Sequence, residues 1–469
     1  MLDYALAILF MSGLASLGFG MAWLFGLRGG RRLAMAYPLG LSSVGLVAWG
    51  MWLAEIPWIY IWTTAWLVGL LSLSFIVFKL TDRPPDLAML KIRLPSLNIF
   101  TSLLLWLSLG SLILILVWLT TIQPVVWDSL VLYDWRAIKI ADGWQVSDFY
   151  RQFVQNYEFY TYDFSHPFMS SIWQAFMHKS GIESSSVIHS GLILSILIYA
   201  GIIWKSWTTR LIFASLLLAT EPSLTVFTQA YSSLPYFLYW LLIFLVWVDS
   251  QIKSSAQKSV LILIFLITLL MNRLSEPFWI LIILFWLWEV WKMWPNMRGQ
   301  KPKWLSVLIR GCLFVIPILA VVWQWQNVQA TALSQVEIMD SVSRSSYSLD
   351  RYENISVILQ TPLWWSQAIW LILFKNPSAP YALLALVMFL IVKTKSGQDK
   401  RLFWLGLGWL AMLLIALIME ITTDPENWLL KSRLLWRVTL PIMAWAIVST
   451  TNWSEKRLSW FDQGNDSDE

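Results

Sequence analysis

Charged side chains are scarce in this sequence of 469 residues, where Asp, Glu, Lys and Arg together make up 13%. Ordinary soluble domains carry about 25%, so the shortage excludes a typical soluble enzyme. There is one cysteine, Cys312, which excludes an intramolecular disulfide and leaves the redox compartment without a sequence marker.

Several catalytic motifs are also missing. The sequence contains no His and Cys residues at zinc-ligand spacing, no Gly-rich phosphate-binding loop and no Gly-x-Ser-x-Gly motif. These absences leave a cytosolic type of ATPase or hydrolase site without support.

Apolar residues dominate what is present. They make up 58% of the chain, the mean hydropathy is +0.62, and runs of about the length needed to cross a bilayer recur from end to end. Many of the 34 tryptophans lie at the ends of these runs, as in interfacial belts. The sequence therefore predicts an all-α polytopic membrane protein, with membrane lipids as partners.

About thirteen spans are expected. We place them at 5–27, 33–54, 59–80, 99–120, 186–204, 211–228, 234–249, 259–271, 277–294, 305–325, 378–393, 402–420 and 435–450. The apolar segment 362–374 is too short to span together with its flanks, so we expect an interfacial or re-entrant helix there.

Lys and Arg are concentrated in short connections, including "RGGRR", "KSWTTR", "DSQIKSSAQK" and "KTKSGQDKR". The positive-inside rule makes these connections cytoplasmic, which requires the N-terminus outside and the C-terminal residues 451–469 as a cytoplasmic tail. The net charge of +5 is thus a topology signal, and no nucleic acid is expected as a partner. We expect the protein in the plasma or inner membrane.

The same alternation places two long loops, 121–185 and 326–377, on the outer face. Long loops in compact proteins are usually functional or disordered, and the first is too rich in aromatic residues to be typical of disorder. We therefore expect the functional site on the outer face.

The segment "VVWDSLVLYDWRAIKIADG" at 125–143 concentrates ionisable groups in the first loop. As a helix it would place Asp128, Arg136 and Lys139 on one side, with Asp134 directed largely away. Asp128 and Arg136 would lie about 12 Å apart along the axis. A carboxylate can accept a proton and a guanidinium can hold a phosphate, although a solvated amphipathic loop helix explains the same pattern.

Further ionisable residues lie at the outer ends of spans. They are Arg273 and Glu276, at i and i+3, and Arg433 and Arg437, at i and i+4. Charges at membrane depth are costly unless they are paired or face water, so they mark candidate sites. Each alone is equally well explained as a residue that snorkels to the interface.

The order of these segments resembles the GT-C superfamily of membrane glycosyltransferases, in particular the family 39-like branch with the dolichyl-phosphate-mannose protein mannosyltransferases. The matching residues are Trp127-Asp128, Tyr133, Arg136-Ala137, His166-Pro167, the turn Tyr231 to Pro235, "NRLSEP" with Glu276, and Arg433-Leu434-Leu435 with Pro441. The resemblance covers roughly residues 100 to 450.

Three features depart from the family pattern. Ser233 stands where the family has an acid, and Glu276 is followed by Pro277 where the family has Gly. The acidic loop follows the fourth span, whereas in many members it follows the first. On this basis residues 1–98 form three additional N-terminal spans, and residues 99–450 form the GT-C-like catalytic module.

The resemblance implies transfer of a sugar from a polyprenyl-phosphate donor to a glycan, lipid or protein acceptor at the outer face, with inversion. Asp128 would be the general base, and the residues expected to bind the donor phosphate or substrate are Arg136, Lys139, His166, Arg273, Glu276, Arg433 and Arg437. No spaced ligand cluster demands a cofactor; a divalent cation, Mg or Mn, bridging the phosphate and Asp128 stays open, since hard cations choose oxygen ligands.

Two other classes of membrane protein remain as alternatives. A lipid-linked glycan polymerase or O-antigen ligase would be expected to carry its main loop late in the chain, whereas the large loop here is early. A transporter or flippase should show charged residues in mid-span and paired broken helices from internal repeats, and few charges lie in mid-span here.

Overall fold

The computed structural model describes residues 2–82, 134–155, 168–182, 185–218, 233–252, 254–272 and 433–464, with scattered helical positions between 312 and 331 and at Val387. Within these ranges every regular element is a helix, which confirms the predicted all-α class for this part of the chain. The chain divides into two compact units, Met1–Asn272 with Thr451–Glu469 (unit 1) and Arg273–Thr450 (unit 2). Most described elements belong to unit 1.

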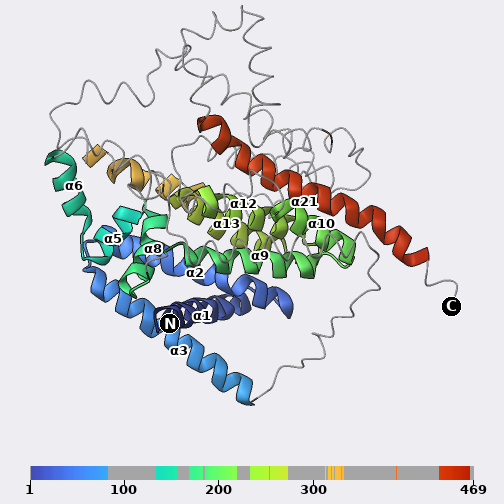
Figure 1. Ribbon diagram of the computed structural model, residues 1–469, viewed down its shortest axis with the longest axis horizontal. Coiled ribbons are helices and arrows are strands. Elements are labelled where there is room, and N and C mark those ends of the chain that lie inside the picture. Colours follow the sequence, from blue (N-terminus) through green and yellow to red (C-terminus); the bar gives the residue numbers. More distant parts are fainter. Residues whose placement is uncertain are drawn as a thin grey trace, which may run out of the picture. The chain divides into compact units, whose positions relative to one another are not determined.

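Three long helices open unit 1: α1 (Leu2–Leu24), α2 (Gly30–Leu53) and α3 (Trp58–Asp82) (Figure 1). They match the first three predicted spans to within a few residues. Their segments Ala5–Leu24, Gly30–Leu53 and Trp58–Ile76 are long and apolar enough to cross a membrane. The physical reason is length, because about 20 helical residues cover the ~30 Å of a hydrocarbon core.

Glycines allow these helices to approach closely. A Cβ on Gly18 of α1 would overlap the carbonyl oxygen of Ala36 in α2, and a Cβ on Gly40 of α2 would overlap the carbonyl oxygen of Leu14. Gly13 of α1 faces Gly69 of α3, where an added Cβ would lie 3.1 Å from the Gly69 Cα. Small residues at helix crossings in this way are typical of membrane helices.

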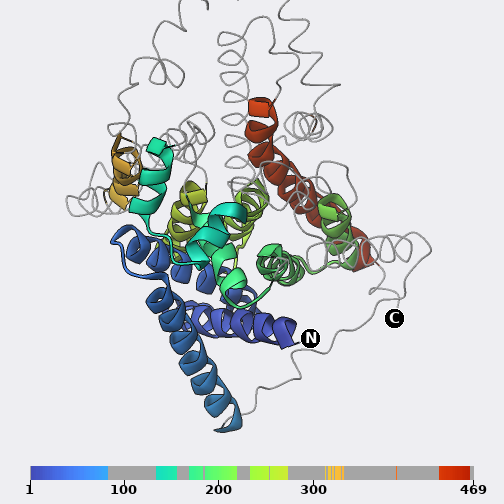
Figure 2. The same ribbon diagram turned by 60° about the vertical axis from the view of Figure 1, so that its left-hand side comes forward.

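The remaining helices of unit 1 are mostly shorter. They are α5 (Trp135–Ala141), α6 (Val146–Gln155), α8 (Met169–Lys179), the 3-10 helix η3 (Ser185–His189), α9 (Ser190–Ile203), α10 (Trp207–Leu218), α12 (Ser233–Val248) and α13 (Ser255–Asn272). The predicted spans at 186–204, 211–228, 234–249 and 259–271 correspond to η3 with α9, α10, α12 and α13. Figure 2 shows the same helices from another side.

Helix α8 was not predicted as a separate element. It lies inside the first long loop, and all its residues from Met169 to Met177 are buried. Its Trp173 indole donates a hydrogen bond to the carbonyl of Leu41 in α2 (3.2 Å) and stacks on Tyr239 of α12 with 5.9 Å between ring centroids. The loop therefore contributes a buried helix to the core of unit 1.

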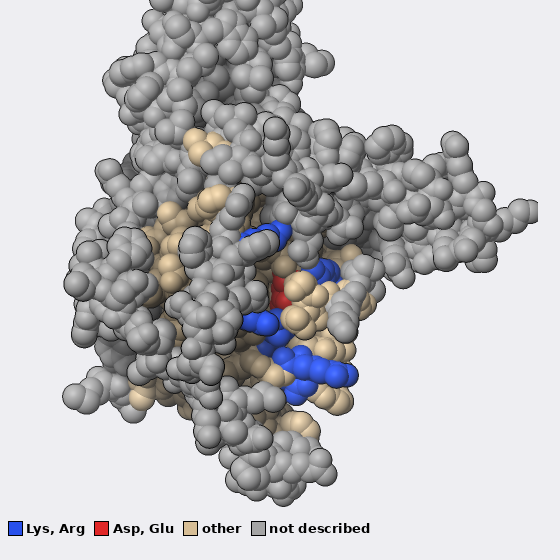
Figure 3. Space-filling view, turned by 90° about the vertical axis from the view of Figure 1, so that its right-hand side faces the viewer, with Lys and Arg blue, Asp and Glu red and all other residues tan. Residues whose placement is uncertain are grey.

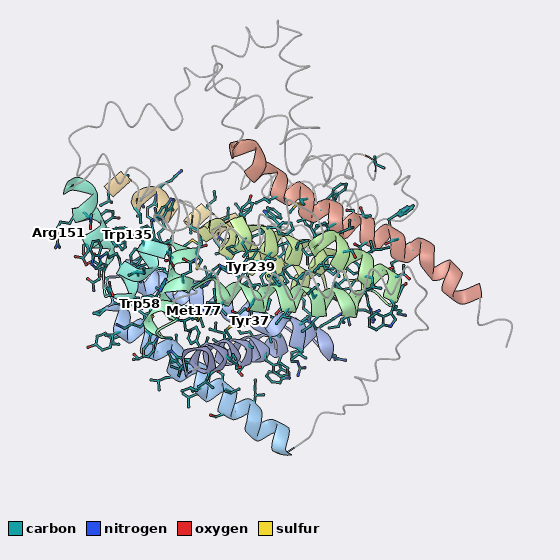
Figure 4. All side chains as sticks on the ribbon, in the orientation of Figure 1. Tyr37, Trp58, Trp135, Arg151, Met177 and Tyr239 are labelled. Carbon is teal, nitrogen blue, oxygen red and sulfur yellow. The ribbon has the colours of Figure 1, made fainter. Side chains whose placement is uncertain are left out.

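The interior of unit 1 is apolar with a few paired polar groups (Figure 4). Tyr37 of α2 donates a hydrogen bond from its hydroxyl to the carbonyl of Ile188, and the hydroxyls of Ser42 and Tyr239 lie 2.9 Å apart. Buried hydroxyls need such partners, because leaving one unpaired costs about 1–3 kcal/mol. These bonds tie α2 to η3 and α12.

The connections of unit 1 gather at two ends. At one, which we call the loop end, the last turn of α2 and the α2–α3 turn at 54–57 contact residues 144–147. At the other, which we call the basic end, the α1–α2 connection meets the end of α12 through Arg31 and Asp249, and the α9–α10 connection meets α21. The alternation of connections across a membrane, and which end faces the cytoplasm, stay predictions.

The last helix, α21 (Arg433–Gly464), covers the predicted span 435–450 and continues through most of the expected tail at 451–469. In unit 1 the Glu455 carboxylate accepts hydrogen bonds from the backbone N–H groups of Lys205 (2.8 Å) and Ser206 (3.3 Å). The spans predicted at 99–120, 277–294 and 402–420, and the segment 362–374, lie outside the described residues.

Candidate functional site

The segment singled out in the sequence forms α5 within its described part. A helix was expected across 125–143, and the structure places α5 at Trp135–Ala141, with Asp134 preceding it and Gly143 (φ 103°) following it. Glycine suits that position because a positive φ is strained for other residues. The helix prediction is confirmed for these seven residues, and Asp128 lies outside the described ranges.

Five aromatic rings surround α5 and α6, and we call them the aromatic cluster: Trp52, Trp135, Trp144, Phe149 and Phe168. Their centroids lie 4.9 to 5.9 Å apart, mostly edge to face. This is the favoured geometry for aromatic pairs, each of which adds about 0.5–1.5 kcal/mol beyond its buried area. The cluster fixes α5 and α6 against α2 and the start of α8; Figure 4 labels Trp135 and Arg151 at this end.

Arg136 is completely buried in this site. Its guanidinium carbon lies 4.5 Å from the centroid of the Phe168 ring, and the residue has 0% exposure. A cation over an aromatic face contributes about 2 kcal/mol or more when it is shielded from water. The contact joins α5 to the residue directly before α8.

Lys139 lies one turn further along α5 and is half-buried. Its Nζ is 5.0 Å from the centroid of the Trp144 ring. The ammonium group therefore lies over an aromatic face, while part of the Lys139 side chain remains exposed. Of the two predicted phosphate-binding cations on α5, Lys139 is the more accessible.

Asp134 and His178 form a pair that the sequence did not indicate. The His178 Nε2 and the Asp134 Oδ1 are 2.7 Å apart, and the side chains are 13% and 14% exposed. A short bond of this kind, charge-assisted when the imidazole is protonated, is stronger than a neutral one. Asp134 was expected to lie largely away from Arg136 and Lys139; the structure pairs it with His178 of α8, with 14% of its side chain exposed.

Helix α2 holds the loop directly. The Trp52 indole donates a hydrogen bond to the Trp144 carbonyl (2.9 Å), and the Gln145 amide donates one to the Glu55 carbonyl (2.8 Å). The Glu55 carboxylate accepts the N–H of Ser147 in the first turn of α6 (3.1 Å). An acid at a helix N-terminus satisfies a free N–H group and complements the helix dipole.

Glu55 combines two further features. It has a φ of 56°, the one positive φ at a non-glycine position among the described residues. Burial, together with the nearby Glu55 carboxylate, raises the pKa of Tyr150 in α6 to about 12. Glu55 thus has a strained backbone and interacts with Gln145, Ser147 and Tyr150. We therefore interpret it as a positioning residue for α6.

The other predicted site residues are placed only in part. Asp128, His166, Arg273 and Glu276 lie outside the described residues. Arg433 and Arg437 fall in the first two turns of α21. In the described part of the chain, no three His, Cys, Asp or Glu side chains converge as a metal site.

Comparison with known proteins adds no family. No family model matches the chain, and neither the curated proteins nor the solved structures contain a match.

Proposed function

We propose that this chain is a GT-C-type membrane glycosyltransferase that moves a sugar from a polyprenyl-phosphate donor to an acceptor at the loop end of unit 1. The proposal draws on the order of motifs in the sequence. Its main structural support is the anchoring of α5, which begins only a few residues after the Trp127-Asp128 pair.

This anchoring matters because a general base works only when it is held in position. Residues 134–149 are fixed by the aromatic cluster, by the Asp134–His178 pair and by the contacts of Glu55 and Trp52. Positioning a reactive group in this way contributes several kcal/mol to a reaction, and small displacements are costly.

The proposed chemistry is a single displacement. An acceptor hydroxyl attacks the anomeric carbon while its proton passes to the Asp128 carboxylate. The bond between that carbon and the phosphate oxygen breaks, and polyprenyl phosphate leaves with the bonding electrons. Charge on the leaving phosphate grows in the transition state, so cations fixed near it lower the barrier.

The cations divide into two groups under this proposal. Lys139, Arg273, Arg433 and Arg437 are assigned to the donor phosphate, with Glu276 and His166 orienting substrate and with Mg or Mn at Asp128 as an optional participant. Arg136 is better suited to holding α5 in place, because its guanidinium is buried over the Phe168 ring.

The proposal includes the membrane topology. About thirteen helices would cross the membrane, with the N-terminus and the loop end outside and the basic end inside. Three apolar helices of sufficient length support the membrane location. The first three spans, expected as an addition, would serve as the scaffold of the catalytic loop, since α2 supplies Trp52 and the α2–α3 turn supplies Glu55.

A matched pair of variants tests the assignment of the base. With the full chain in phospholipid vesicles and a panel of polyprenyl-phosphate hexoses, Asp128→Asn should reduce release of polyprenyl phosphate by about 10² to 10⁴-fold. Asp142→Asn makes the same chemical change at an exposed position after α5 and should keep full turnover.

Both variants must show the same thermal unfolding as the unmodified protein, so that loss of fold does not imitate loss of catalysis. Undiminished turnover by Asp128→Asn would remove this residue from the mechanism. Absence of release from every donor in the unmodified protein would contradict the proposed function itself.

A further inference from the structure

The basic end of unit 1 carries cations that its acids do not neutralise. Asp249 is 1% exposed and is already bound by the Arg31 guanidinium (2.6 and 3.2 Å), the Tyr199 hydroxyl (3.0 Å) and the Gln251 N–H (2.9 Å). Glu455 accepts backbone hydrogen bonds at the start of the α9–α10 connection.

Other cations at this end remain accessible. Arg28 and Lys205 are exposed, and neither side chain makes an ion pair with a described residue. On the face that Figure 3 shows, Lys and Arg side chains gather around one acidic patch. Among the described residues of this face, positive charge is therefore in local excess.

Two of the cations lie where the chain turns from α1 into α2. Arg28 is exposed in this turn, and Arg32, in the first turn of α2, is half-buried. The Arg32 Nε donates a hydrogen bond to the Leu27 carbonyl (3.0 Å), and its guanidinium carbon lies 5.3 Å from the Phe19 ring centroid. These contacts hold the Arg32 guanidinium in place while its terminal nitrogens stay available for a phosphate.

Large apolar side chains are exposed beside the two arginines. Trp23 is 61% exposed, Leu24 is 74% exposed and Leu33 is 59% exposed. They belong to the last turn of α1 and the first turn of α2, the same two helix ends that carry Arg28 and Arg32. A guanidinium held in place next to exposed apolar side chains is suited to bind a lipid with an anionic headgroup and hydrocarbon chains.

We propose that the α1–α2 turn binds an anionic phospholipid. Its headgroup phosphate lies between the Arg28 and Arg32 guanidinium groups, and its acyl chains pack along Trp23, Leu24 and Leu33. The site is at the end of unit 1 opposite to α5 and α6. It is independent of the proposed transfer reaction, since it uses none of the residues assigned to that reaction.

Lipid titration followed by native mass spectrometry of the full-length protein tests the site. Phosphatidylglycerol should bind with a lower apparent dissociation constant than phosphatidylcholine, which has the same chains and no net charge. Each juxtamembrane cation contributes about a fivefold change in binding, so the double variant Arg28→Gln, Arg32→Gln should weaken phosphatidylglycerol binding by about 25-fold.

Two control variants separate charge from other effects. Arg28→Lys with Arg32→Lys keeps the charge and should retain most of the preference for phosphatidylglycerol. Arg151→Gln removes one charge from the loop end, where the side chain is 70% exposed, and should leave binding unchanged. Thermal unfolding in phosphatidylcholine reports whether each variant keeps its fold.

Three results would overturn the proposal. The first is equal affinity for phosphatidylglycerol and phosphatidylcholine. The second is that Arg151→Gln weakens phosphatidylglycerol binding as much as the double variant Arg28→Gln, Arg32→Gln does. The third is complete competition by glycerol phosphate at equal concentration, which would show a site for a free phosphate and not for a lipid with its acyl chains.

Discussion

Asp134 and His178 illustrate what single residues contribute to the loop end. They are 44 positions apart in the sequence, one directly before α5 and the other in α8, yet their side chains meet at 2.7 Å. No local pattern connects them, so the sequence did not predict the pair. The same holds for Arg31 and Asp249, which are 218 positions apart. Long-range partners of this kind become visible only when the helices are assembled.

Removing the imidazole should loosen α5. His178→Ala leaves a mostly buried carboxylate without this partner, and a hydrogen bond to a charged group contributes about 1.5–3 kcal/mol. Backbone amides of α5 should then exchange with deuterium roughly tenfold to a hundredfold faster. Lys179→Ala, at the neighbouring exposed position, should leave exchange unchanged. Equal exchange in both variants would show that the pair does not hold α5.

Tyr150 provides a pH-dependent test of the Glu55 position. Its pKa in the folded protein is raised to about 12 by burial and by Glu55. As the pH rises, the unfolded chain loses the phenolic proton first, so the stabilisation is complete below about pH 10 and is lost between about pH 10 and 12.

Glu55→Gln should lower the Tyr150 pKa without restoring its ordinary value, because burial, the larger cause, remains. The near-ultraviolet absorbance of ionised tyrosine, taken as the difference from Tyr150→Phe, measures this pKa. Asp142→Asn should leave it unchanged. A Tyr150 pKa that does not respond to Glu55→Gln would place the carboxylate too far away to hold α6.

At the scale of helices, long elements were predictable and short buried ones were not. α1, α2 and α3 were found from the sequence because each is an apolar run of membrane length bounded by Gly, Pro or charged residues. α8 has only 11 residues and sits in a loop rich in aromatics, so no length signal separated it from its surroundings. Its burial depends on α2, α5 and η3, which a sequence pattern does not show.

The contact between α1 and α2 depends on two glycines. Gly18→Ala should lower the unfolding temperature, because the new methyl group would overlap the Ala36 carbonyl and force the helices apart. Overpacking of this kind costs about 1–3 kcal/mol. Gly20→Ala, in the same helix with nothing within 4 Å, should keep or raise the unfolding temperature. A thermal scan in detergent that shows equal temperatures would contradict the close packing.

At the scale of the whole chain, composition predicted an all-α membrane protein, because charges are few and apolar runs recur; the described residues are all-helical and include three helices long and apolar enough to cross a membrane. The sequence also indicated which segment carries ionisable groups, and the structure places α5 of that segment in a fixed setting. It could not distinguish a cation held for packing from one held for a ligand. Arg136 and Lys139 lie one turn apart in sequence, and their burial separates them.

The central claim is that this chain breaks the bond between a sugar and a polyprenyl phosphate. The most direct measurement uses the unmodified protein in phospholipid vesicles with a radiolabelled polyprenyl-phosphate hexose and counts sugar transferred and polyprenyl phosphate released. A transferase predicts equal amounts of both, with inversion at the anomeric carbon. Movement of the intact donor across the membrane without release, or release only from diphosphate donors, would contradict the proposed function.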